Sequence, residues 1–239
     1  MISFSHKNRS SQKEVMDSLD FQGDELNNLL LDLKAINKWL GGNHITIDGV
    51  KKLIKNHSRD NAVTIIDIGC GDGEMLRKCA DYSVKQNLRF KLIGIDFNEN
   101  ILEIAKSKSV GYSNISFLNM DVVNNTEAIP ESDIVLCTLF LHHFKNEEIE
   151  KLIKKFLVKS RLGIVINDLE RSKLAFNLFK LVHKLFLKTK TARHDGLISI
   201  ARGFKKNELV RFSGHIPNQK STIRWCWAYR FQWIINKNK

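Results

Sequence analysis

The stretch Val63-Thr64-Ile65-Ile66-Asp67-Ile68-Gly69-Cys70-Gly71-Asp72-Gly73 decides the fold. Its first half is rich in β-branched residues, which is typical of a strand buried on both faces of a parallel sheet. Three glycines follow at alternate positions, and a helix is expected over about 73–85. Glycine lets a backbone approach a ligand closely, and the first turn of a helix offers free N–H groups. The stretch therefore predicts a strand, a turn and a helix that together bind a ligand.

Outward from this stretch, apolar runs of strand length alternate with helical patterns. Five strands are expected, over residues 63–68, 90–96, 115–120, 133–138 and 162–167. Asn98 is expected to cap the helix after the second strand, because its side-chain oxygen accepts free N–H groups of a first turn. Strands that alternate with helices indicate a parallel sheet covered on both faces. The segments 222–227 and 231–235 are expected to add a terminal hairpin.

The residues before the first strand predict helices. A helix is expected over about 11–40, because apolar side chains recur over 26–40 with a period near 3.6 residues, and Gly41-Gly42 ends this helix. Asp48 is expected to cap a second, short helix that runs to about residue 55. We therefore divide the chain into an N-terminal helical extension over 1–58 and an α/β domain over 59–239.

The composition sets bounds on the class of protein. A hydrophobic content of 43% in 239 residues is enough for a buried core, and no run approaches the roughly 18 apolar residues that span a bilayer. The start of the chain is polar, so no signal peptide is expected. The cysteines lack metal-ligand spacing, and we expect a cytoplasmic protein with reduced thiols. The net charge of +12 is compatible with nucleic acid, an anionic membrane or an acidic partner, and selects none of these.

Acidic residues close the next two strands. Asp96, with Phe97 beside it, ends the second strand, where a carboxylate can accept the hydroxyls of a ribose. Met120-Asp121-Val122 ends the third strand. A dinucleotide fingerprint would need a third glycine where Glu74 stands, so this alternative fails. Taken alone, the glycines could also form a purely structural tight turn. The glycine turn, Asp96 and Met120-Asp121-Val122 follow three successive strands, and together they favour the binding of a nucleoside cofactor.

The pattern D-x-G-C-G-x-G over 67–73, the acid at Asp96 and the N-M-D over 119–121 resemble class I S-adenosylmethionine (SAM)-dependent methyltransferases, in the ubiquinone-biosynthesis-like, small-molecule branch. The resemblance spans about 62–168 and implies a Rossmann-like, seven-stranded, mostly parallel sheet with an antiparallel last strand. It also implies SAM as cofactor and S-adenosylhomocysteine (SAH) as product. The residues that it places at the cofactor are Asp67, Gly69, Cys70, Gly71, Gly73, Asp96, Phe97, Met120, Asp121, Val122 and Cys137. Among them the glycines would approach the methionine part of SAM, Asp96 would bind the ribose, and Asp121 would bind the adenine amino group.

Motifs in the second half are similar to those of a narrower group, the bacterial methyltransferases encoded near type III polyketide synthases. These motifs are Asn167-Asp168-Leu169, 192–196, 202–204 and 224–227, together with Met16-Asp17 and 40–42. The resemblance implies O-methylation of a phenolic, polyketide-type acceptor in secondary metabolism. We expect a monomer or a homodimer with a lipophilic small-molecule acceptor.

The loop after the fourth strand carries two histidines, His142 and His143. Ligands bind outside the carboxyl ends of parallel strands, so this loop is expected to face the transferred methyl group. Asp168 ends the fifth strand, and the resemblance implies that a histidine and an aspartate at these places remove the proton of the acceptor. The alternatives are a structural histidine pair, an N-cap role for Asp168, and catalysis by the pair His194-Asp195. No metal is expected, because Thr138 stands where metal-dependent enzymes of the catechol type carry an acid.

Two other functions stay open. An RNA or protein methyltransferase would use the basic surface for docking, but no RNA-binding module is recognisable, and no nucleic-acid partner is expected. A SAM-binding protein without catalysis carries the same motifs. The loop after the fourth strand lacks the Asn/Asp-Pro-Pro-aromatic signature of amide or adenine methylation, and Cys137 lacks the preceding proline of a cytosine-C5 nucleophile.

An insertion over about 171–190 follows the fifth strand. It predicts an amphipathic helix whose lysines share one side. Three roles stay open for this helix: packing on the core, forming a lid over a lipophilic acceptor, or lying on an anionic membrane.

Overall fold

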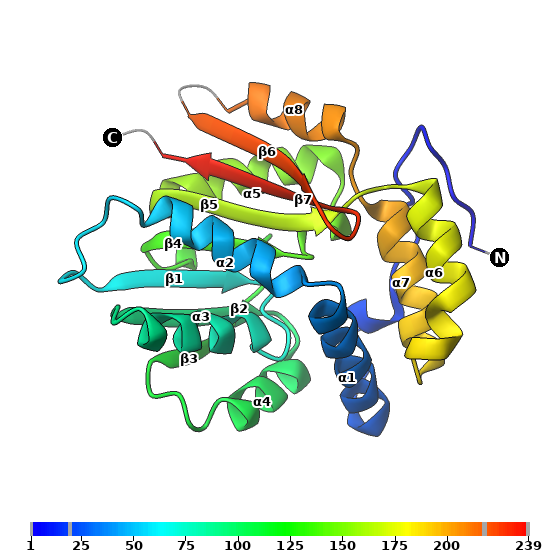
Figure 1. The fold of residues 1–239 in the computed structure, drawn as a ribbon, viewed down its shortest axis with the longest axis horizontal. Coiled ribbons are helices and arrows are strands. Elements are labelled where there is room, and N and C mark those ends of the chain that lie inside the picture. Colours follow the sequence, from blue (N-terminus) through cyan, green and yellow to red (C-terminus); the bar gives the residue numbers. More distant parts are fainter. Residues whose placement is uncertain (1, 19–20, 217–218, 238–239) are drawn as a thin grey trace.

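The computed structural model describes residues 2–18, 21–216 and 219–237, and the side chain of Leu185, in the predicted insertion, lies outside this description. A seven-stranded sheet runs through the molecule in the order β3-β2-β1-β4-β5-β7-β6 (Figure 1). Its strands are β1 (Val63–Ile68), β2 (Phe90–Asp96), β3 (Ile115–Asn119), β4 (Ser132–Thr138), β5 (Ser160–Leu169), β6 (Lys220–Cys226) and β7 (Arg230–Asn236). Strand β7 is antiparallel to both of its neighbours, and the other neighbouring pairs are parallel. The predicted fold class is confirmed, including the antiparallel last strand.

The three central strands end at a common edge of the sheet. The register pairs Ile68 of β1 with Ile95 of β2 and with Cys137 of β4. The strand order reverses between β1 and β4, because the chain first adds β2 and β3 on one side of β1 and then returns to the other side. A crevice forms at such a switch point, outside the carboxyl ends of the strands. The fold thus brings the predicted site residues of separate strands to one place.

Helices cover both faces of the sheet. They are α1 (Gly23–Trp39), α2 (Gly42–Leu53), α3 (Glu74–Lys85), α4 (Glu99–Lys108), α5 (Asn146–Lys159), α6 (Lys173–Phe186), α7 (Lys190–Arg202) and α8 (Lys206–Gly214), with short 3-10 turns η1 (Val15–Asp17), η2 (Thr126–Ala128) and η3 (Leu141–His143). Val50 of α2 and Leu76 of α3 pack in the core on one face, whereas Phe156 of α5 and Phe212 of α8 pack in the core on the other. The predicted cap is confirmed at Asn98, whose side chain accepts the N–H groups of Asn100 and Ile101.

Two predictions for the N-terminal region are wrong. The helix expected from residue 11 begins only at Gly23, and residues 11–18 are non-helical apart from the turn η1. Asp48 does not cap α2 but lies within it, where its carboxylate pairs with Lys52 at 2.8 Å and with Arg224 at 2.7 Å. Helix α2 starts earlier because Gly41, with a φ of 68°, reverses the chain directly after α1.

The N-terminal segment (residues 2–18) runs beside α6 and α7 (Figure 1). Hydrogen bonds to α7 hold the backbone of this segment at two places. The N–H of Ser10 donates to the carbonyl of Ala201 over 3.0 Å. The N–H groups of Val15 and Met16 donate to the carboxylate of Asp195 over 2.9 and 3.0 Å. These contacts fix the segment across the carboxyl edge of the sheet.

The predicted insertion over 171–190 contains α6, which packs on α7. Phe176 shares a small core with Ile200, and the ring of Phe179 lies against Gly196. The opposite side of α6 exposes large apolar residues, namely Leu174, Leu178 and Leu181. In the described part of the chain, no helix is both long and apolar enough to cross a membrane.

Candidate active site at the switch point

The glycine turn connects β1 to α3 in a conformation that favours glycine. Gly69, Gly71 and Gly73 have φ angles of 67°, 52° and 75°, in the left-handed region that side chains disfavour. A Cβ on Gly69 would collide with the ring of Phe140, whereas a Cβ on Gly71 would meet open space. Gly73 occupies the N-cap position of α3. The turn therefore offers bare backbone to the crevice, as predicted from its sequence.

Two buried carboxylates lie behind this turn. Asp96 accepts the N–H of Gly71 on Oδ2 over 3.0 Å and the N–H of Asn98 on Oδ1 over 3.1 Å. Burial raises the pKa of the Asp96 carboxyl. Asp67 is also buried, and its Oδ1 has no hydrogen-bond partner among the residues that the structure describes. Burial, and then the charge of Asp96, raise the pKa of Asp67 to about 8. A cationic ligand beside this pair would relieve their repulsion.

A cavity of about 350 Å³ opens at the ends of β1, β2 and β3. Predicted cofactor residues that line it are Gly69, Gly71, Asp96, Phe97, Met120, Asp121 and Val122. Aromatic rings of Phe140 and Phe144 complete its apolar wall. The cavity combines a carboxylate, bare backbone and flat apolar surface, which suits a nucleoside.

A second cavity of about 170 Å³ adjoins the first. The residues that line both cavities are Met16, Gly69, Gly71, Leu139 and His143. Asp67 and Cys70, two more of the predicted cofactor residues, line the second cavity, whereas Gly73 and Cys137 line neither. Cys137 is enclosed in the core, where burial raises the pKa of its thiol. The structure thus brings most of the predicted cofactor residues to two adjoining spaces.

His142 lies in η3, just after β4, between two carboxylates. Its Nδ1 is 2.7 Å from Oδ1 of Asp168, and its backbone N–H donates to Oδ2 of the same residue over 3.2 Å. Its Nε2 is 3.4 Å from Oε1 of Glu14. Burial lowers the pKa of His142, but Asp168 and Glu14 outweigh this effect and raise the pKa to about 9. The predicted pairing of His142 with Asp168 is present, and the imidazole lines the second cavity although it is only 2% exposed.

His143 is the histidine that lines both cavities. Its side chain is 19% exposed, and its Nδ1 is 3.0 Å from Oδ1 of Asp17. The rings of His142 and His143 lie 4.3 Å apart at an angle of 34°. The carbonyl of His142 accepts from Arg9 over 2.8 Å and from Arg202 over 3.0 Å, which fixes the loop. The two histidines therefore have different surroundings, although they are adjacent in sequence.

The other catalytic candidates have structural contacts. Ser172, not Asp168, caps α6 by accepting the N–H of Ala175, so the N-cap alternative for Asp168 is wrong. Asp195 is buried and holds the backbone of the N-terminal segment. The side chain of His194 is 48% exposed and lines a separate cavity that shares no residue with the first two. The structure does not bring His194 to the histidine pair.

The N-terminal segment supplies acids that sequence reasoning did not assign to the site. Glu14 reaches His142, and Asp17 reaches His143. Glu14 also belongs to a possible metal-binding group, because one ligand atom each of Glu14, His142 and His143 lie within 4.8 Å of one another. The expectation of no metal considered only the end of β4, where the hydroxyl of Thr138 bonds to that of Thr46. The sequence pointed to this segment only through the Met16-Asp17 motif, to which no catalytic or ligand-binding role was assigned.

Residues 65–158 match the family model described as a methyltransferase domain. A protein of Geobacillus sp. (strain WCH70) that is named as a methyltransferase is 37% identical over 60 residues, which are 25% of this chain and 22% of that protein. Another, YqeM of Bacillus subtilis (strain 168), is 31% identical over 111 residues, which are 45% of this chain and 42% of that protein. The chain thus matches less than half the length of these curated relatives. The matched family domain covers β1 from Ile65 onward, the glycine turn and the histidine pair.

Solved structures show the same fold over most of the chain. The plantazolicin methyltransferase BpumL in complex with SAH has a TM-score of 0.65 at 18% identity, and the match covers 90% of this chain and 89% of that one. Magnesium protoporphyrin IX methyltransferase from Synechocystis PCC 6803 with bound SAH has a TM-score of 0.57 at 17% identity, covering 85% of this chain and 87% of that one. The sheet order and these likenesses agree on a Rossmann-like methyltransferase fold.

Proposed function

We propose that this protein is a SAM-dependent methyltransferase that methylates a hydroxyl oxygen of a lipophilic, phenolic or polyketide-type small molecule. The observation that carries this proposal is the pair of adjoining cavities at the switch point, with His143 on the wall that they share. The methyltransferase-domain match over 65–158 supports the reaction class. The solved relatives with SAH or SAM bound support the cofactor.

The first cavity is assigned to the adenosine part of SAM. Asp96 would accept the ribose hydroxyls, Phe97 would lie against the adenine, and Asp121 would accept its amino group. The methionine part would pass over the glycine turn toward Asp67. SAM carries a positive sulfonium and a positive ammonium group, and a cation bound beside Asp67 and Asp96 would favour the ionised form of both carboxyl groups.

The second cavity is assigned to the acceptor, beside the methionine part of SAM at Asp67. Its wall includes apolar side chains, such as those of Leu30, Leu33 and Leu169, which suit a lipophilic molecule. Among the described residues that line either cavity, Lys34 is the sole lysine, so the basic surface does not continue into the crevice. This arrangement favours a small molecule over the RNA or protein acceptor that the charge alone permits.

The chemistry needs only orientation and the loss of one proton. The acceptor oxygen attacks the methyl carbon, the new O–C bond forms as the C–S bond breaks, and the electron pair stays on sulfur to give SAH. Holding the oxygen in line with that bond contributes roughly 7–11 kcal/mol in favourable cases. His143 assists deprotonation because it borders both cavities, and Asp17 stabilises its charge at 3.0 Å. His142 and Asp168 hold the loop in position.

The test is a methyl-transfer assay with isotopically labelled SAM and a panel of hydroxylated aromatic polyketides, read by mass spectrometry. We expect a labelled methyl group on an oxygen, with SAH formed in equal amount. Transfer to RNA that weakens steeply between low and moderate salt would support the docking alternative instead. SAM that fails to bind to folded protein would contradict the proposal altogether.

A further inference from the structure

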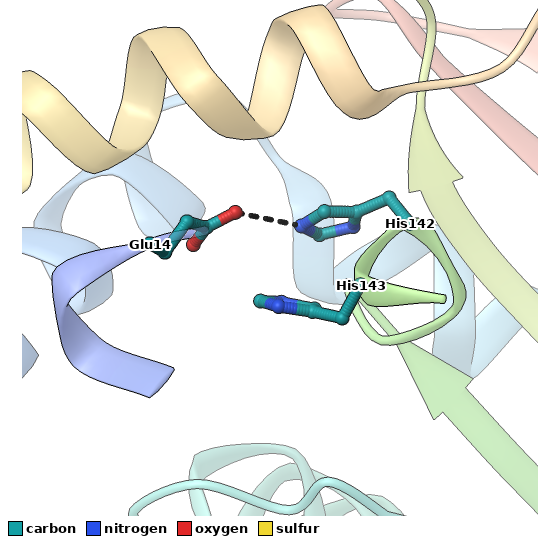
Figure 2. Close-up of side chains that lie close together, drawn as sticks. All are labelled: Glu14, His142 and His143. Atoms are coloured by element: carbon teal, nitrogen blue, oxygen red, sulfur yellow. Dashed lines mark ion pairs between the residues drawn. The ribbon is translucent and has the colours of Figure 1, made fainter. Parts of the chain in front are cut away.

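Three metal-ligating side chains from two distant segments meet on the wall of the second cavity. Glu14 comes from the N-terminal segment, and His142 and His143 come from η3 (Figure 2). We propose that these three residues bind a divalent metal ion of the zinc type. The inference deepens the function proposed above, because it specifies how the histidine pair acts on the acceptor.

The spacing of the ligand atoms fits a tetrahedral ion. The distance between Nε2 of His142 and Oε1 of Glu14 is 3.4 Å. Zinc bonds of about 2.0–2.2 Å in tetrahedral geometry place two ligand atoms roughly 3.3–3.5 Å apart. His143 offers a third atom within 4.8 Å of the other two. Glu14 and His142 therefore have the spacing of zinc ligands, and His143 lies close enough to complete the set after a side-chain adjustment.

A buried nitrogen in this cluster has a carboxylate neighbour but no well-formed hydrogen bond. His142 is only 2% exposed, and in the described part of the chain its Nε2 makes no hydrogen bond of good geometry, although it lies 3.4 Å from Oε1 of Glu14 in an ion pair. Buried polar atoms nearly always have hydrogen bonds of good geometry, so a nitrogen that has only this long ion pair, beside a second imidazole, points to a ligand. A metal ion between the three residues would satisfy this nitrogen.

Surrounding groups orient the ligands as they do in known zinc sites. Asp168 lies 2.7 Å from Nδ1 of His142, and a carboxylate on the far nitrogen fixes the tautomer that leaves Nε2 free to bind metal. Asp17 lies 3.0 Å from Nδ1 of His143. The hydroxyl of Ser199 donates to Oε1 of Glu14 over 2.8 Å. Two imidazoles and one carboxylate form a ligand set of catalytic zinc, which keeps a fourth position for water or substrate.

That fourth position would be available to the acceptor, because all three ligands line the second cavity. A hydroxyl bound to zinc loses its proton more easily, since the cation stabilises the oxyanion. The proton passes to water, the oxygen attacks the methyl carbon of SAM, and the C–S electron pair stays on sulfur. With zinc bound, His143 acts on the acceptor through the ion rather than as the base itself.

The experiment is a titration of chelator-treated, full-length protein with Zn²⁺ in competition with a chromophoric chelator. We expect one high-affinity site per chain. Glu14→Gln and His143→Ala should each weaken binding by more than about 100-fold, and Asp168→Asn by about 10- to 100-fold, because outer-shell partners tune metal affinity. The matched control is His215→Ala, which removes an exposed imidazole paired with Glu150 at 2.8 Å and should change nothing. The titration is repeated in Cys226→Ser, which removes a half-buried thiol.

Equal affinities of His143→Ala and His215→Ala for Zn²⁺ would overturn the metal site, as would the absence of stoichiometric binding by the original protein. His142→Ala is informative only if it folds, but Glu14→Gln and His143→Ala decide the question without it. Calorimetry of SAM with the metal-free protein separates the two proposals. Retained SAM binding without a zinc site refutes this inference alone, whereas failure to bind SAM refutes the proposed function.

Discussion

Asp96→Asn removes a charge from the wall of the first cavity and keeps the shape of the side chain. The carboxylate accepts the N–H of Gly71 over 3.0 Å and the N–H of Asn98 over 3.1 Å. An amide has a single acceptor oxygen, so it can keep only one of these bonds. The loss of charge should therefore weaken cofactor binding and also loosen the glycine turn.

The expected size of the effect follows from the hydrogen bonds to ribose. A hydrogen bond to a charged group contributes about 1.5–3 kcal/mol. Losing the equivalent of one such bond lowers SAM affinity roughly 10- to 150-fold, because each 1.4 kcal/mol corresponds to about a factor of ten. Asp81→Asn is the matched control, because Asp81 bonds to the hydroxyl of Tyr112 and lines neither cavity.

Isothermal titration calorimetry with SAM and with SAH measures both variants, and thermal unfolding confirms that they fold. We expect Asp81→Asn to bind like the original protein. An unchanged affinity of folded Asp96→Asn would refute the assignment of Asp96 to the ribose. An equal loss in both variants would show that net charge, and not the position of Asp96, governs binding.

His143→Ala should lower kcat by about two to four orders of magnitude in a single-turnover assay while SAM binds normally, and a drop of less than tenfold would contradict its role. Because the pKa of Asp67 is raised to about 8, the folded state holds a proton that the unfolded state releases near pH 4, so this residue should make the free energy of unfolding decrease as pH rises from about 4 to 8. Denaturant unfolding at several pH values should show a smaller decrease in Asp67→Asn, and parallel profiles would refute the shift. Leu181 lies on the exposed side of α6. If this helix lies on a membrane, the original protein should sediment with anionic vesicles and Leu181→Glu should not. If the original protein does not bind vesicles and Leu181→Glu raises the KM for the acceptor, the result would support a lid.

The fold could be predicted because its decisive signals are local. The β-branched run before Asp67 and the closely spaced glycines determine a buried strand and a tight turn by sterics alone. The carboxyl ends of parallel strands share an edge, so His142 and Asp168 could be placed together although they are far apart in sequence. The helical period over 26–40 was correctly read for the same reason, since the residues that repeat lie within α1, apart from Leu40, which is its C-cap.

The N-terminal segment could not be predicted, because tertiary contacts determine its conformation. Val15 and Met16 bond to Asp195, about 180 residues further along the chain. Nothing in their local sequence opposes the predicted helix, so long-range hydrogen bonds override a weak propensity. The same contacts carry Glu14 and Asp17 to the histidine pair, which is why the sequence did not assign them to the site.

A crystal structure of the protein with SAH tests the central claim most directly. We predict adenosine in the first cavity, its ribose hydroxyls on the carboxylate of Asp96, and the sulfur at the wall shared by both cavities beside His143. SAH bound elsewhere, or bound with its ribose away from Asp96 and its sulfur away from His143, would contradict the account.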